Sequence, residues 1–139
     1  MSFTNIIDSF HGENRWLSNF WIHDSENMLS VEHYYQAAKA TNAEDYARVL
    51  TCKTPGEAKK LGKEIICRAD WEDVRLTLME HFLREKFFWN TALAAKLKST
   101  SNCLLVEGNT WGDTFWGVCD GEGQNHLGKL LMKIRDEFL

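Results

Sequence analysis

Two stretches of the chain repeat apolar residues with the period of about 3.6 residues that marks an amphipathic helix. In the stretch that ends near Trp89, the apolar positions are Val74, Leu78, Met79, Phe82, Leu83 and Phe87. Near the C-terminus they are Leu127, Leu130, Leu131, Ile134 and Phe138. Basic residues of this second stretch lie outside its apolar stripe, at Lys129, Lys133 and Arg135. The pattern therefore predicts two helices, each of which buries one apolar face.

Polar residues predict where a third helix begins. The segment TPGE, residues 54–57, supplies Thr54 as N-cap, Pro55 at the first helical position and Glu57 to complete a capping box. The apolar positions that follow extend this helix through Ala58, Leu61 and Ile65.

Two further polar residues mark helix starts, and four short segments have the composition of strands. Asp70 is placed to cap the long helix, and Asn90 to start a shorter helix that carries Leu93 and Leu97. Aromatic and branched residues favour strands at residues 3–7, 15–22, 103–107 and 115–119. Because 139 residues fit one domain, we expect a single domain over residues 1–139. Its fold class is α+β, with several helices packed around a small sheet.

Composition excludes several classes of protein. No apolar run approaches the roughly 20 residues of a membrane span, and no secretory signal is visible, so we expect a cytoplasmic protein that does not enter membranes. The net charge of -4 argues against general binding to nucleic acid backbones. The four cysteines are widely spaced and the five histidines are scattered, so we expect no metal and reduced, mostly buried thiols.

The segment VEHYYQAAK, residues 31–39, is unusually rich in groups that move protons, stack on rings or donate hydrogen bonds. If it is a helix, one narrow face carries Glu32, Tyr35, Gln36 and Lys39. This polar face either meets water or lines a site, and a tyrosine is an uncommon choice for a face that meets water. His33 lies off this face, and we interpret it as a packed or capping histidine.

Two other segments carry candidate chemistry. Residues 111–128, WGDTFWGVCDGEGQNHLG, lead through three glycines into the last helix. Free N–H groups at that helix start would suit phosphate, whereas the alternative is a polar turn with Asn125 as N-cap. In RWLSNF, residues 15–20, Ser18 and Asn19 either cap a turn or reach the hydroxyls of a ligand. Six tryptophans leave room for one that stacks on a planar ligand.

Nine short blocks in sequence order carry a resemblance to a known family. They are LSNF (17–20), VEHYYQAAKA (31–40), TPGEAKKLGK (54–63), DWEDVRLTLM (70–79), KF (86–87), LVE (105–107), D (113), WG (116–117) and GQNHLGKLLMKIR (123–135). Together they span nearly the whole chain and closely resemble the NADAR family. The segment VCDGEGQN departs from the pattern, in which many members have a longer loop and a glycine where Cys119 stands, and this departure bears on substrate identity.

The resemblance implies an N-glycosidase, a hydrolase that acts on N-glycosyl bonds without a cofactor. Its expected substrates are phosphorylated ribosides, either ADP-ribose linked to guanine or an early intermediate of riboflavin synthesis. Nucleic acid would then be a partner only as a modified substrate, and the sequence indicates no oligomeric state. By position, Glu32 and Lys39 resemble the family's catalytic pair, and Asp113, which matches a ligand-pocket motif, is a third catalytic candidate as a group that could activate water. The substrate-binding candidates are Asn19, Tyr35, Gln36, Trp116, Gly117 and Asn125.

Breaking an N-glycosidic bond requires a proton for the departing nitrogen and an electron-rich group at the sugar C1. Glu32 can supply the proton if burial raises its pKa from about 4.3 towards neutrality. Lys39 can attack C1 if its pKa falls by roughly 3 units from about 10.4. Desolvation favours that fall and a nearby carboxylate opposes it. Alternatively, Glu32 or Asp113 activates water, while Lys39 binds phosphate or the developing charge.

Two other classes of function stay open at the level of sequence. One is a module that binds ADP-ribose or a related nucleotide without cleaving it. The other is a structural protein whose tryptophans only fill the core. The polar face that contains Glu32 and Lys39 favours the enzyme, because a binding module has little use for that pair.

Overall fold

The computed structural model describes residue 3 and residues 5–138. The chain divides into two units. Unit 1 combines the N-terminal residues through Ser18 with the chain from Phe87 onwards, and unit 2 is Asn19–Lys86. The prediction of a single domain over residues 1–139 stays a prediction. Helices and short strands occur in both units, which confirms the α+β class.

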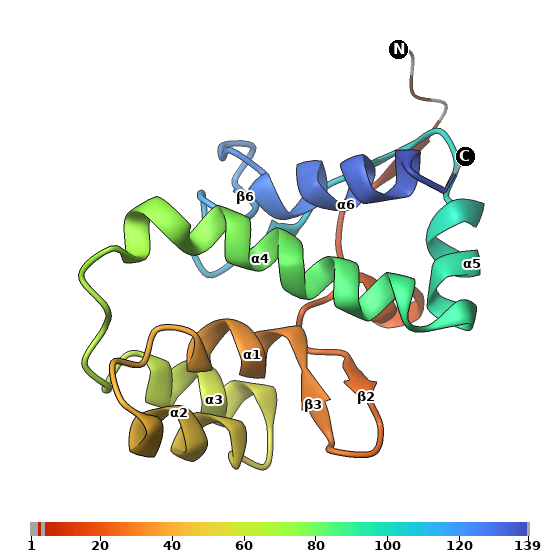
Figure 1. Cartoon of the computed structure of the whole chain (residues 1–139). Helices are drawn as coiled ribbons and strands as arrows, with labels where there is room; N and C mark the ends of the chain where they lie inside the picture. Colours follow the sequence, from red (N-terminus) through yellow and green to blue (C-terminus); the bar gives the residue numbers. More distant parts are fainter. Residues whose placement is uncertain (1–2, 4, 139) are drawn as a thin grey trace. The chain divides into compact units, whose positions relative to one another are not determined.

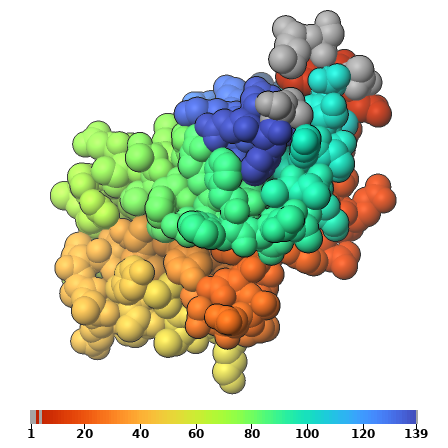
Figure 2. Space-filling model, turned by 45° about the vertical axis from the view of Figure 1, so that its right-hand side comes forward, coloured from red at the N-terminus to blue at the C-terminus, as the bar shows by residue number. Residues whose placement is uncertain are grey.

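Unit 2 contains a hairpin and a group of helices. Its elements are β2 (Ile22–Asp24), β3 (Leu29–Ser30), α1 (Val31–Ala37), α2 (Ala43–Leu50), α3 (Pro55–Gly62) and α4 (Trp71–Phe88), of which the last two residues belong to unit 1. Strands β2 and β3 pair antiparallel, and α1, α2 and α3 lie side by side (Figure 1). The exposed turn of the hairpin, residues 25–28, lies on the surface in orange in Figure 2.

The helices of unit 2 enclose a small apolar core. Ala37 of α1, Val49 of α2 and Ala58 of α3 are fully buried, and Ile65 packs against them. Alanines at the contact between α1 and α3 allow the two backbones to approach closely, because their side chains are short. The close approach also brings the side chain of Gln36 on α1 against Gly62 of α3.

Unit 1 contains the remaining short strands and two helices. Its elements are β1 (Asn5–Ile7), the 3-10 helix η1 (Gly12–Leu17), α5 (Thr91–Ser99), β4 (Cys103–Leu105), β5 (Gly108–Asn109), β6 (Val118–Cys119) and α6 (His126–Asp136). Strand β1 pairs parallel with β4, and β5 pairs parallel with β6. Helix α6 packs on β4 (Figure 1). The sheet is thus not continuous but consists, within the described residues, of separate two-stranded pairs.

The predicted helix starts are largely confirmed. Thr54 caps α3 by accepting from the Glu57 N–H, with Pro55 at the first position, and Asn90 caps α5 in the same way. The Glu57 carboxylate, however, accepts from the Lys53 N–H, so the capping box is displaced by one residue. Helix α3 also stops at Gly62, before Ile65.

Three other predictions need correction, and one is confirmed in position. Residues 15–17 belong to η1 instead of a strand, because Trp16 and Leu17 are both buried and neighbouring residues of a strand point to opposite faces. Asp70 directly precedes α4 as predicted, and its carboxylate pairs with Arg68 at 2.6 Å. Arg135, expected outside the apolar stripe, is buried. None of the four cysteines is fully buried.

Three of the four predicted strand segments contain a strand of the structure. Strands β1, β4 and β6 fall inside the predicted segments 3–7, 103–107 and 115–119. Within the segment 3–7, residue 4 lies outside the described residues. Among the helices the structure describes, none has the length and apolar content needed to cross a membrane.

Candidate functional site

The candidate residues are divided between the two units. Unit 2 holds Asn19, Glu32, Tyr35, Gln36 and Lys39. Unit 1 holds Asp113, Trp116, Gly117 and Asn125. The two groups have different local environments.

Helix α1 begins at a closed capping box that positions its polar face. Ser30 Oγ accepts from the His33 N–H at 3.2 Å, and the His33 ring accepts from the Ser30 N–H at 3.2 Å. The other ring nitrogen of His33 lies 2.9 Å from the carbonyl oxygen of Cys52. Both ring nitrogens of His33 are therefore occupied, which confirms His33 as a packed, capping residue.

Most of the polar face is buried, and its fourth residue, Lys39, is half-buried and lies beyond the end of α1. Glu32, Tyr35 and Gln36 are buried, and Glu32 is only 7% exposed. Gln36 Nε2 donates to Glu32 Oε2 at 2.6 Å. A carboxylate and a carboxamide held together in a buried place are costly unless they are paired or used, since each loses its water. Burial argues against a face that simply meets water, and the assignment of this face to a site stays a prediction.

Lys39 follows α1 directly and lies in an aromatic environment. Its N–H donates to the Gln36 carbonyl at 3.2 Å, and its carbonyl accepts from the Arg68 N–H at 2.8 Å. The Lys39 Nζ lies 5.9 Å from the centroid of the Tyr35 ring and 5.7 Å from that of Trp71. The backbone hydrogen bonds position Lys39 in the turn after α1, and its amine lies near the two aromatic rings.

The pKa of Lys39 is lowered from its ordinary value, and burial is the largest cause. The positive charges of Arg75 and Lys63 lower this pKa further. Cys67 and the carboxylate of Glu32 oppose the change by favouring the charged amine. The balance is in the direction that a nucleophilic amine requires, and the effect of Glu32 places its charge within electrostatic reach of Lys39.

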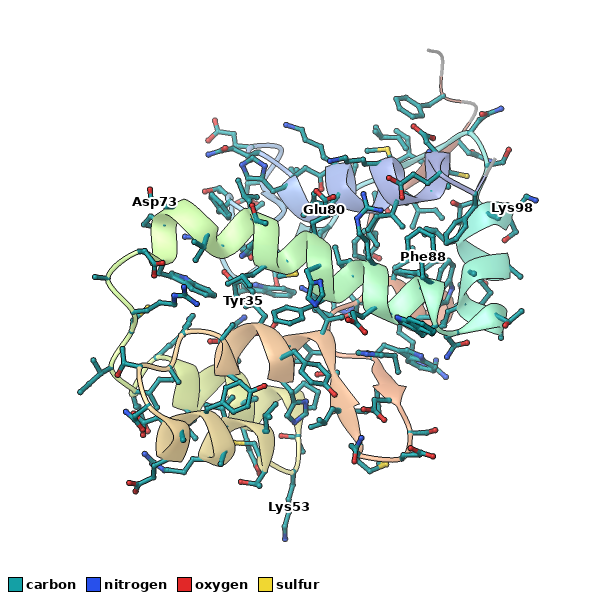
Figure 3. All side chains as sticks on the ribbon, in the orientation of Figure 1. Tyr35, Lys53, Asp73, Glu80, Phe88 and Lys98 are labelled. Carbon is teal, nitrogen blue, oxygen red and sulfur yellow. The ribbon has the colours of Figure 1, made fainter. Side chains whose placement is uncertain are left out.

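Trp71 is a residue that the sequence patterns did not identify as part of this group. It is buried at the first position of α4, and its ring centroid lies 5.0 Å from that of Tyr35. Figure 3 shows Tyr35 between α1 and α4. The apolar pattern of a helix predicts that a tryptophan is buried, but it does not predict which side chains surround it. The position of Trp71 near the Lys39 amine was therefore not predictable from the pattern.

Asn19 contacts the first turn of α1 through its backbone, and one polar atom of its side chain has no hydrogen-bond partner. Its carbonyl accepts from the Glu32 N–H at 3.0 Å, which places it beside the candidate acid. Its Nδ2 donates only weakly, to Met79 Sδ at 3.6 Å, and its buried Oδ1 has no hydrogen-bond partner. A buried amide oxygen without a partner is uncommon, and a ligand hydroxyl would satisfy it.

In unit 1, the loop around Asp113 is ordered by that carboxylate. Asp113 Oδ1 accepts from the N–H groups of Phe115 and Trp116 at 3.1 and 2.9 Å. The Trp116 ring packs edge-on against Phe115, with centroids 4.8 Å apart, and lies 6.4 Å from His126. Asp113 therefore has a structural use in the same loop that carries Trp116.

The start of α6 does not offer the free N–H groups that we expected from its glycine-rich approach. The N–H groups of Gln124, Asn125, His126 and Leu127 donate to the carbonyls of Thr114, Gly117, Phe115 and Trp116 respectively. The chain before α6 folds back on residues 114–117, so these donors are used inside the loop. The prediction of a phosphate site made by these four N–H groups is wrong.

Asn125 and Gly117 have clear structural uses. Asn125 occupies the N-cap position with φ of 54°, but its side chain makes no cap bond. Instead its Oδ1 accepts from the Glu107 N–H at 3.0 Å and its Nδ2 donates to the Leu105 carbonyl at 2.9 Å. Gly117 is buried, and a Cβ there would collide with Glu107. Asn125 is therefore the N-cap residue, as predicted, but without a side-chain cap bond, and the binding roles of both residues stay predictions.

The described residues contain no group of three or more His, Cys, Asp or Glu side chains arranged to hold a metal ion.

Comparison with known proteins identifies the family to which this fold belongs. Residues 7–139 match the family model described as NADAR domain. The NMR structure of the Escherichia coli protein YbiA superposes with a TM-score of 0.84 and 31% identity, covering 99% of this chain and 87% of that chain. The chain belongs to the NADAR family.

Three curated relatives have informative names. An N-glycosidase of Nostoc punctiforme is 38% identical over 118 residues, which cover 78% of this chain and 73% of that protein. The N-glycosidase YbiA of Escherichia coli is 33% identical over 118 residues, with 83% and 73% coverage. A riboflavin biosynthesis protein of Vibrio vulnificus is 40% identical over 112 residues, or 78% of this chain, but the chain spans only 30% of that protein's length.

Proposed function

We propose that this chain hydrolyses the bond between C1 of a phosphorylated riboside and a base nitrogen. Relatives that match most of the chain are named N-glycosidases, and the chain is an enzyme that hydrolyses N-glycosyl bonds. The observation that carries the proposal is the buried Glu32–Gln36 pair on the helix that leads into Lys39, whose pKa is lowered by burial.

In the covalent version, the neutral amine of Lys39 attacks C1. The bond from C1 to the base nitrogen breaks, and that nitrogen takes a proton from the Glu32 carboxyl group. The Glu32 carboxylate then takes a proton from the lysine nitrogen and passes it to the ring oxygen as the sugar ring opens, which gives a protonated Schiff base. Water then adds to C1 and releases the sugar, which returns the amine and the proton to the enzyme.

In the second version, water attacks C1 directly. Glu32 or Asp113 takes a proton from this water and returns it to the departing base nitrogen, and Lys39 binds phosphate or stabilises the developing charge. The two versions differ in one bond, between Lys39 Nζ and C1. Borohydride reduces a Schiff base to a stable amine, so a sugar-sized adduct on Lys39 during turnover would support the first version. An active enzyme that is never trapped would support the second.

Recognition of the substrate phosphate calls for positive charge. Unit 2 supplies it near Lys39, since both Arg75 and Lys63 act on the pKa of that amine. We assign the phosphate to these cations rather than to the N–H groups before α6, which are already bonded. Trp116 remains our candidate for stacking on the base.

The two substrate classes separate by direct assay. The wild-type chain is incubated with an ADP-ribosylated guanine and, separately, with an early phosphorylated intermediate of riboflavin synthesis. Released base or sugar is then measured by chromatography. The family resemblance supports both, and turnover of one and not the other assigns the substrate class.

Glu32→Gln tests the role of the acid. The amide keeps the size of the side chain but cannot donate or accept a proton in catalysis, so we expect turnover to fall by at least about 10²-fold. Circular dichroism and thermal unfolding check that the variant folds. Full activity in a folded Glu32→Gln protein would refute the assignment.

The alternative is a module that binds ADP-ribose or a related nucleotide without cleaving it. The incompletely satisfied Asn19 and the cations around Lys39 would serve such a module as well. Tight binding of ADP-ribose by calorimetry, with no product from either substrate class, would favour this alternative over the enzyme.

A further inference from the structure

Gly62 of α3 faces the side chain of Gln36 on α1 at very short range. Gly62 is buried, and a Cβ added there would overlap Gln36 Oε1 and come within 2.7 Å of its Cδ and 3.1 Å of its Cβ. Such distances to a neighbouring side chain require movement of that side chain. The space where other residues carry a Cβ is thus filled by the Gln36 carboxamide.

The position of this carboxamide affects Glu32, because the nitrogen end of the amide is bonded to the Glu32 carboxylate. Gln36 Nε2 donates to Glu32 Oε2 at 2.6 Å, whereas Gln36 Oε1 is buried and has no hydrogen-bond partner. Oε1 occupies the place that a Cβ of residue 62 would take, so the missing side chain of Gly62 leaves room for this oxygen. Contact with Gly62 therefore helps to fix which end of the amide points to Glu32.

We propose that Gly62 is a positioning residue for Glu32, acting through Gln36. The proposal rests on the proposed function only in taking Glu32 as the catalytic acid. Any side chain at residue 62 would push the Gln36 amide away from α3 and change its hydrogen bond to Glu32. Because misplacement of a catalytic group by about 1 Å can cost about 10²-fold in rate, the effect should appear in turnover.

Helix α3 offers a matched control. Gly56 lies on the same helix, and a Cβ there would meet only Thr54 Oγ1, at 3.9 Å, which is ordinary contact. Alanine also favours helix more than glycine does, so Gly56→Ala has no reason to disturb the fold. The two substitutions add the same methyl group to the same helix and differ only in what it meets.

The kinetic experiment compares Gly62→Ala, Gly56→Ala, Gln36→Ala and the double variant with both Gly62→Ala and Gln36→Ala. We expect Gly62→Ala to lower kcat by about 10- to 100-fold with little change in KM. Gly56→Ala should match the wild type. The double variant should have the kcat of Gln36→Ala alone, because both changes act through one side chain. Effects that multiply would overturn the proposal, as would wild-type kcat in Gly62→Ala.

A second measurement is independent of activity. The side-chain amide signals of Gln36, assigned in ¹⁵N NMR spectra by their loss in Gln36→Ala, should shift in Gly62→Ala and stay in place in Gly56→Ala. Unmoved signals in Gly62→Ala would refute the contact even if Glu32 proved not to be catalytic. If Gly62→Ala does not fold, the double variant, in which the obstructing amide is removed, is expected to fold. Failure of the double variant as well would show that Gly62 serves the helix contact and not Gln36.

Discussion

At the scale of single residues, the state of the Lys39 amine depends on its neighbours. Burial, Arg75 and Lys63 lower its pKa, and Cys67 and Glu32 raise it, with a lowered pKa as the result. In the covalent mechanism the rate should rise with pH as this amine loses its proton. Removing the positive charge of Arg75 favours the protonated amine, so Arg75→Gln should move that rise to higher pH.

The test is the dependence of kcat/KM on pH. Arg84→Gln is the matched control, because Arg84 lies on the same helix, is also paired with a glutamate, and does not act on Lys39. We expect the rise to move in Arg75→Gln and to stay in place in Arg84→Gln. A pH profile that is identical in all three proteins would argue for the mechanism in which water attacks directly.

Single residues also show what the sequence could predict. Helical spacing predicted that Glu32 and Gln36 share one face, and their hydrogen bond confirms this, whereas Lys39 lies beyond the end of α1 at Ala37. The burial of Arg135 was not predictable in this way. Its guanidinium donates to Thr100 Oγ1 and to the Cys103 carbonyl, which are 35 and 32 residues away in the chain. Only the tertiary fold brings such partners to a residue.

At the scale of elements, helix starts were predicted well and the paths of loops were not. A cap such as Thr54 or Asn90 acts within three residues, so the signal is local. The loop before α6 instead receives its N–H partners from residues 114–117. The glycines of this loop predict a tight turn, but they do not predict which carbonyls accept hydrogen bonds from its N–H groups.

Asn125 links three segments, and its removal should destabilise unit 1. Asn125→Ala leaves the buried Leu105 carbonyl and the Glu107 N–H without their partners, at a cost of about 1–3 kcal/mol for each group. We expect a loss of about 2–6 kcal/mol in the free energy of unfolding, measured with urea. The exposed neighbour Gln124 provides the control, and Gln124→Ala should change stability little. A folded Asn125→Ala protein with wild-type stability and a raised KM would instead support a direct role in substrate binding.

At the scale of the whole molecule, two buried bases should make stability depend on pH. The pKa of His23 is lowered to about 4, mainly by burial and then by Lys86, with Asp24 opposing. The unfolded chain binds this proton below pH 6.5, whereas the native protein binds it only near pH 4. The contribution of His23 to stability should therefore be constant above pH 6.5 and fall as the pH drops from 6.5 to 4. His23→Phe should reduce this fall in urea unfolding, and His81→Phe, at an exposed position, should not.

Lys86 acts in a different range of pH. This side chain is completely buried, and burial lowers its pKa from 10.5 to about 7. The unfolded chain keeps the proton up to pH 10.5, whereas the native protein releases it near pH 7. Stability from this group should therefore rise with pH between 7 and 10.5, by about 5 kcal/mol at most, and be lowest and constant below 7.

The variant Lys86→Met isolates this contribution, because methionine is unbranched, of similar length and never charged. Urea unfolding between pH 7 and 10 should show a smaller rise of stability in Lys86→Met than in the wild type. Lys98→Met, which changes an exposed lysine of α5 (Figure 3), should follow the wild-type curve. Other groups that titrate in this range affect all three proteins equally, so only the differences between curves are compared. Parallel curves for the wild type and Lys86→Met would mean that the amine stays protonated in the native protein, and that burial does not set its charge.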